Sequence, residues 1–149
     1  ETAIVDALRE ASRLMPEPDR SRPAILLVTD GLENASSGSV QDAIEAARAI
    51  GTPIYVLGLG GLDRQIQDRG AGNSPWDPLR VVAEQSGGAF FEVLGEEQAQ
   101  RAAEQLANEL RHQYWLAFKP SGPADGRFRP IKVSVDRGGA RIRSRSGYK

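Results

Sequence analysis

The chain has 149 residues, and 40% of them are hydrophobic, which is enough apolar material for one folded domain with a small appendage. The absence of cysteine excludes disulfides and thiolate metal sites, and no apolar run is long enough to cross a membrane. The net charge of -1 hides an asymmetry: residues 1–110 carry 9 basic and 18 acidic side chains, whereas residues 111–149 carry 10 and 2. Such a split predicts a nucleic-acid or membrane patch, or two halves of opposite charge that attract each other.

The first 112 residues alternate between two kinds of hydrophobic pattern. Apolar residues at helical spacing, bounded by capping residues, predict helices at residues 2–15, 39–51, 77–87 and 96–112. Short apolar runs between them predict strands at residues 24–29, 53–59 and 89–93. Strands that alternate with helices form parallel sheets with right-handed crossovers. The predicted class is therefore a doubly wound, mainly parallel α/β fold of Rossmann-like type.

The C-terminal part of the chain follows a different pattern. Tyr114 to Phe118 is predicted to be a fourth strand. Residues 128–135 and 140–146 alternate between apolar and polar side chains on either side of a Gly-rich turn, which predicts an antiparallel hairpin beside that strand. We therefore expect a partial α/β domain at residues 1–112 and a β extension at residues 113–149.

The strand at residues 24–29 leads directly into Asp30 and Gly31. In open parallel sheets, ligands bind beyond the carboxyl ends of the strands, so Asp30 is the first candidate for a functional residue. Gly31 allows the chain to turn away at once, which would leave the carboxylate at the rim of the sheet. The alternative is that Asp30 only caps a loop or a helix, as Asp often does after a strand.

Four blocks, in the same order along the chain, resemble the second half of a von Willebrand factor type A (vWA) domain. They are residues 2–8 (TAIVDAL), 27–34 (LVTDGLEN), 54–60 (IYVLGLG) and 86–91 (SGGAFF). Four ordered blocks are a more specific signal than any one of them. Residues 113–149 resemble the tail of a bacterial, secreted subgroup of that family, and this resemblance favours an extracellular or periplasmic location.

The resemblance implies a metal-ion-dependent adhesion site in which Thr2 and Asp30 are ligands. Mg²⁺, or Mn²⁺ or Ca²⁺ in its place, prefers such hydroxyl and carboxylate oxygens, and a protein partner would complete the shell with its own carboxylate. The family's first loop, Asp-x-Ser-x-Ser, does not occur in this sequence. We therefore expect the chain to begin after the family's first three strands, and to bind metal only if the missing loop is supplied.

Two further residues are candidates for binding a partner. Asn34 lies in the loop that follows Asp30, within the block that resembles the family. Trp76 ends the long segment that begins at Gly60, and an exposed tryptophan there would be a good anchor for a protein partner. The alternative for Trp76 is a packed loop residue. Trp115, in the predicted fourth strand, is expected in the core.

Other functions have less support in the sequence. Gly58 to Gly61 follows a strand as a dinucleotide loop does, but Asp63 occupies the place of the third glycine. The only histidine, His112, ends a helix, so neither a zinc site nor a Ser-His-Asp triad is expected. A basic stripe of Arg141, Arg143 and Arg145 would bind phosphates, although charged strand faces are commonly just solvated. The leading hypothesis is a protein-binding module that is not an enzyme; a nucleotide-binding or enzyme domain and a nucleic-acid binder are the alternatives.

The missing strands also have a consequence for the sheet. In the family order the absent first strand lies beside the strand at residues 24–29, so one edge of this apolar strand would have no partner. A bare apolar edge promotes association with other chains. We therefore expect this edge to be covered by a lost N-terminal segment, which we favour, by a symmetry partner, or by the C-terminal hairpin of this chain. Without such a cover, the isolated chain should be poorly soluble or oligomeric through this edge.

Overall fold

The computed structural model describes residues 3–15, 23–30, 38–60, 74, 76–120, 122–123 and 125–148. Its helices are α1 (Ile4–Leu14), α2 (Val40–Ile50), α4 (Asp77–Ser86) and α5 (Glu96–Arg111). Its strands are β1 (Ile25–Thr29), β2 (Ile54–Leu59), β3 (Phe90–Val93), β4 (Arg129–Pro130) and β5 (Gly147–Tyr148). Within the described residues, the predicted helices and the first three predicted strands are confirmed to within a few residues at their ends.

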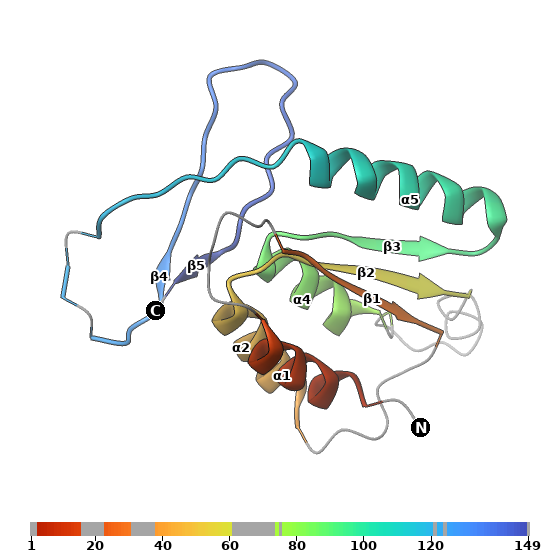
Figure 1. Ribbon diagram of the computed structural model, residues 1–149, viewed down its shortest axis with the longest axis horizontal. Coiled ribbons are helices and arrows are strands. Elements are labelled where there is room, and N and C mark those ends of the chain that lie inside the picture. Colours follow the sequence, from red (N-terminus) through yellow and green to blue (C-terminus); the bar gives the residue numbers. More distant parts are fainter. Residues whose placement is uncertain are drawn as a thin grey trace.

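The centre of the fold is a parallel sheet in the order β1-β2-β3. Leu27 pairs with Val56 in the first ladder, and Val56 pairs with Phe90 in the second, so β2 is bonded on both edges. Helices α1, α2 and α4 lie on one face of the sheet, and α5 lies on the other face above β3 (Figure 1). The architecture is thus α/β and compatible with the predicted Rossmann-like class.

Helix α2 illustrates how local sequence sets these elements. The side chain of Ser39 accepts a hydrogen bond from the backbone N–H of Asp42, and the Asp42 carboxylate accepts one from the backbone N–H of Ser39 at 2.6 Å. This reciprocal capping box satisfies two N–H groups at the start of the helix. The hydrogen bonds from Ser39 hold the pKa of Asp42 below its usual value. At the other end, Gly51 adopts a left-handed conformation with φ of 67°, which suits glycine.

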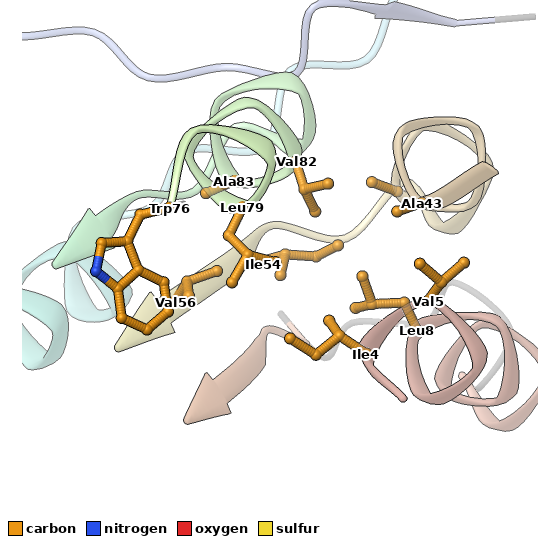
Figure 2. Close-up of a cluster of buried hydrophobic side chains, with 11 residues drawn as sticks. Ile4, Val5, Leu8, Ala43, Ile54, Val56, Trp76, Leu79, Val82 and Ala83 are labelled. Carbon is orange, nitrogen blue, oxygen red and sulfur yellow. The ribbon is translucent and has the colours of Figure 1, made fainter. Parts of the chain in front are cut away.

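The larger core fills the space between the sheet and the three helices α1, α2 and α4. Its fully or nearly fully buried side chains come from all of these elements: Ile4, Val5, Leu8, Ala43, Ala47, Ile54, Val56, Trp76, Leu79, Val82 and Ala83. Figure 2 shows Ile54 and Val56 of β2 between the side chains of α1 and those of α4. Burying each Val, Leu or Ile side chain of this cluster contributes roughly 1.5–3 kcal/mol to stability.

The opposite face of the sheet has a smaller core. Tyr55, Ala89 and Leu106 are buried there, with Phe91 and Leu110 packed against them. Burial is the main cause that raises the pKa of the Tyr55 phenol, and the nearby Glu109 carboxylate adds to it.

The smaller core lies beneath α5 and does not extend over all of β1. Leu26 and Val28 remain 49% and 52% exposed. The sheet is therefore covered more completely on the face of α1, α2 and α4 than on the face of α5.

Trp76 corrects one sequence-based prediction. Its side chain has no exposed surface, and its ring lies 5.6 Å from the ring of Phe90, centroid to centroid. The packed alternative is therefore the one observed, because a buried indole presents no surface to a protein partner. The reason is its position immediately before α4, where the chain turns back onto the sheet.

The C-terminal extension corrects another prediction. Residues 114–118 are extended but form no strand, and Trp115 is 71% exposed instead of buried. A strand exists only where a neighbouring strand pairs with it, and among the described residues this segment has none. The predicted antiparallel pairing is seen, but as a ladder of only two residues on each side, with Arg129 opposite Tyr148 and Pro130 opposite Gly147.

Side-chain contacts attach this extension to the helical face of the domain. The Ser146 hydroxyl donates a hydrogen bond of 2.6 Å to Oε1 of Gln85 in α4, and Arg48 of α2 donates to the same oxygen at 3.0 Å. The Arg48 guanidinium also lies 4.5 Å above the ring of Phe128. The end of the extension is thus held on α2 and α4.

The first prediction concerns Gly88, which lies so close to β2 that a Cβ atom would come within 1.9 Å of the Ile54 carbonyl oxygen. Because backbone cannot yield as a side chain does, we expect Gly88→Ala to destabilise the protein by about 3 kcal/mol or more. Urea unfolding followed by circular dichroism measures this. Gly138→Ala is the control, since nothing lies within 4 Å of the point that its added Cβ atom would occupy. Equal stability of the two variants would contradict this packing.

The second prediction uses the contrast between the two tryptophans, of which Trp76 is buried and Trp115 is 71% exposed. In Trp115→Phe, fluorescence from Trp76 should be blue-shifted and poorly quenched by acrylamide. In Trp76→Phe, fluorescence from Trp115 should be red-shifted and readily quenched. Trp76→Ala should also lower the free energy of unfolding by about 3–5 kcal/mol, because it leaves a large cavity. Efficient quenching of Trp76 in the folded protein would refute its place in the core.

Candidate functional site at the carboxyl end of β1

The candidate site lies where β1 ends. Thr29, the last residue of the strand, is 7% exposed and is paired in register with Gly58. Asp30 follows immediately and is exposed. Thr29 is buried and Asp30 is exposed, so the Asp30 carboxylate lies at the rim of the sheet. The sequence prediction for the position of Asp30 is confirmed; its chemical role is not tested by this geometry.

The rim around Asp30 is built from the ends of the neighbouring strands. The backbone N–H of Gly60, just after β2, donates a 2.8 Å hydrogen bond to the carbonyl of Val93 at the end of β3. Leu94 follows β3 and is 45% exposed. Helix α1 begins on the side toward which the strand arrows point (Figure 1), so its N-terminal end belongs to the same edge of the molecule.

The chemistry available at this rim is that of one carboxylate. Within the part of the chain that the structure describes, no group of three or more His, Cys, Asp or Glu side chains is placed to hold a metal ion. A hard cation prefers about six oxygen ligands, so Asp30 could supply one of them and the others must come from elsewhere. The proposed co-ligand Thr2 and the candidate binding residue Asn34 both lie outside the described residues.

Gly58, the first glycine of the sequence that resembles a nucleotide loop, lies within β2 and has a role in packing. A Cβ atom on Gly58 would lie 2.8 Å from the ring of Phe90 and 3.3 Å from the ring of Trp76. The glycine therefore makes room for two aromatic rings inside the core. A dinucleotide loop instead uses its glycines to bring backbone close to a phosphate. Residues 61–73, which would contain the rest of such a loop, are not among the described residues.

The arginines of the C-terminal extension do not form the predicted stripe on one strand face. Arg141, Arg143 and Arg145 lie in a segment without strand pairing. Arg143 forms an ion pair of 3.4 Å with Glu109 on α5. This contact joins the basic tail to the acidic domain, as expected if the two halves attract each other. His112, at the end of α5, contacts the Asn108 carbonyl through Nδ1 at 2.7 Å.

A second ion pair shapes the tail itself. The Arg129 guanidinium donates to Asp125 at 2.8 Å and to the carbonyl of Pro123 at 2.7 Å. A backbone hydrogen bond from Arg127, together with the charge of Arg129, lowers the pKa of Asp125. Arg129 is therefore engaged within its own segment.

Comparison with known proteins identifies a similar fold but no family for this chain. No protein-family model and no curated protein matches the chain. A solved structure described as conserved hypothetical protein BatB from Bacteroides thetaiotaomicron is similar over 75% of this chain and 60% of that chain, with 23% identity and a TM-score of 0.54. The chain thus spans less than two thirds of the protein it matches. None of the described helices is both long and apolar enough to cross a membrane. The likeness to BatB establishes a shared α/β fold, in accord with the vWA-like fold expected from the sequence.

Proposed function

We propose that this chain is part of a vWA-type protein-binding module that is not an enzyme, and that Asp30 is its principal binding residue. The observation that carries the proposal is the exposed carboxylate of Asp30 directly after an apolar parallel strand whose end is buried. Ligands of open α/β sheets bind beyond this end of the strands. The fold shared with BatB is consistent with this proposal.

The proposed mode of binding is bridging by a divalent cation. Asp30 would provide one oxygen ligand, Thr2 a second, and an Asp-x-Ser-x-Ser loop from another segment the remainder. With few negative charges around it, Mg²⁺ would stay electrophilic and accept a carboxylate from a protein partner. The position of α1, which begins at the edge of the sheet where β1 ends (Figure 1), supports a contribution from the residues before it.

The alternatives have less support. A nucleotide-binding role relied on the glycines from Gly58 to Gly61, and packing against Phe90 and Trp76 accounts for Gly58. Nucleic-acid binding relied on a basic stripe, and Arg143 is paired with Glu109. We also propose an extracellular or periplasmic location. Its support is the resemblance of residues 113–149 to the tail of a secreted bacterial subgroup of the vWA family.

The third prediction tests Asp30 as a metal ligand. Because the Asp-x-Ser-x-Ser loop is absent, Mg²⁺ should bind this chain with a dissociation constant of about 1 mM or weaker. Mn²⁺ added below stoichiometry should still broaden the NMR amide signals closest to Asp30, including those of Thr29 and of Gly58, its partner in β2. This broadening should vanish in Asp30→Asn.

Asp136→Asn is the matched control, because Asp136 is an exposed carboxylate in a distant turn. It should leave the broadening pattern unchanged. Tight Mg²⁺ binding that survives Asp30→Asn, or broadening centred on another part of the sheet, would overturn the assignment.

A further inference from the structure

The C-terminal extension presents a run of exposed apolar side chains. Tyr114, Trp115 and Leu116 are 88%, 71% and 71% exposed, and Phe118 is 54% exposed. No described strand pairs with this segment, and it leads away from the domain after α5 (Figure 1). An exposed apolar patch of this kind on a folded protein is typical of a surface that binds a partner or a membrane.

Contacts at both ends hold this segment in place. It continues directly from α5, and at its other end the Phe118 ring packs edge-on against Tyr148, with 5.3 Å between the ring centroids. The backbone N–H of Ser146, two residues before Tyr148, donates a 3.1 Å hydrogen bond to the carbonyl of Gln85 in α4. The exposed side chains thus belong to a segment that the domain anchors, which lowers the entropy cost of binding through it.

Basic side chains accompany the apolar segment. Residues 111–149 carry a net charge of +8. Three arginines of this region form ion pairs with Asp125 or Glu109. Six other exposed basic residues form no ion pair with a described residue: Arg111, Lys119, Lys132, Arg137, Arg141 and Arg145. Two of these six flank residues 114–118 closely. A basic cluster of this size attracts the headgroups of anionic lipids.

The extension and Asp30 lie at opposite ends of the sheet. Asp30 follows the carboxyl end of β1, whereas the extension is attached at Gln85, next to the Ser86 side chain that contacts the start of β2. Strand β2 has six residues and therefore spans about 20 Å. Figure 1 shows the strand arrows pointing away from the extension. A surface bound by the extension would leave the rim around Asp30 accessible.

We propose that residues 114–118 and the basic residues around them dock this chain on an anionic lipid bilayer. Tyrosine and tryptophan favour the headgroup level, where the ring is buried and its polar atom reaches water. Leucine and phenylalanine add apolar area that is buried at the boundary with the acyl chains. Because no described strand pairs with this segment, its backbone groups need water or headgroups as partners, and it lies at the surface without crossing the bilayer.

The side chains of the segment favour lipid over single-stranded nucleic acid, another anionic partner. Bases stack on aromatic rings, which would use Tyr114 and Trp115 but give no role to the exposed Leu116. Insertion at a bilayer surface buries all three side chains. The charge distribution also orients the chain: residues 1–110 carry a net charge of -9, which an anionic bilayer repels, whereas it attracts the extension. The rim around Asp30 is thereby turned away from the bilayer.

Co-sedimentation of the unmodified chain with lipid vesicles tests the proposal. We expect binding to vesicles with about 30% phosphatidylglycerol, and roughly tenfold weaker binding to vesicles of phosphatidylcholine alone. Leu116→Asp should weaken binding to the anionic vesicles about tenfold, because it removes apolar area and adds a charge that the surface repels. Leu94→Asp is the matched control, since it makes the same exchange at an exposed leucine at the opposite end of the sheet and should leave binding unchanged. Far-ultraviolet circular dichroism verifies that each variant is folded. Failure to bind the anionic vesicles, equal binding to both kinds of vesicle, or equal loss in the two variants would overturn the proposal.

Tryptophan fluorescence then identifies the docking segment. Trp76 is already buried, so a blue shift on addition of the anionic vesicles reports on Trp115. The shift should be absent in Trp115→Phe, which retains Trp76. A blue shift that persists in Trp115→Phe would overturn the proposal, as would binding to single-stranded DNA by a chain that leaves the vesicles unbound. Both measurements are made without divalent cations, so their outcome is independent of metal binding at Asp30.

Discussion

The fold depends on the close approach of the end of α4 to the start of β2. Gly88 lies against the Ile54 carbonyl so closely that no larger residue fits. Next to it, the Ser86 hydroxyl accepts a 2.9 Å hydrogen bond from the backbone N–H of Ile54 and donates one of 2.7 Å to the carbonyl of Ala83. Ser86 is buried, so both hydrogen bonds are shielded from water and their loss would leave polar groups unsatisfied. The direction of α4 relative to the sheet is thereby fixed.

This junction determines which surfaces are covered. With α4 fixed on β2, Ile54 and Val56 are sealed beneath α1, α2 and α4, and β2 becomes the fully paired centre of the sheet. On the opposite face, the one helix among the described residues, α5, packs above β3. Strand β1 is therefore less well covered: Leu26 and Val28 are about half exposed, and the exposed Asp30 follows at the end of the strand. The proposed binding residue thus follows the strand whose outer edge no described strand covers.

The sequence predicted the α/β part of the fold because its signals are local. Helical spacing, the capping box at Ser39 and the glycine at position 51 each specify their element through neighbours a few residues away. The prediction for residues 114–118 was wrong because a strand also needs a partner, and an apolar pattern does not reveal whether one is available. The prediction that Trp115 is buried was wrong for the same reason. Trp76 was ambiguous because burial of a residue before a helix depends on where the helix docks.

The sequence predicted where the candidate site lies but not which residues would bind a ligand there. The run of apolar residues ending in Asp30 located the rim of the sheet, because strands buried by helices end where polar residues begin. The ligands of a metal come from loops that are distant in sequence, so spacing alone could not assemble them. The role of Gly58 was also hidden, since only the structure reveals the two aromatic rings that require it.

The central claim, that β1 is an apolar strand paired with β2 on one edge and with no described strand on the other, is tested most directly by amide hydrogen exchange at single-residue resolution. In dilute, monomeric protein, the amide of Leu27 should be protected by its hydrogen bond to β2, whereas those of Leu26 and Val28 should exchange much faster. Amides of β2 and β3 provide the reference for full protection. Equal, strong protection of Leu26, Leu27 and Val28 in the monomer would contradict the claim, because it would mean that the chain itself covers this edge.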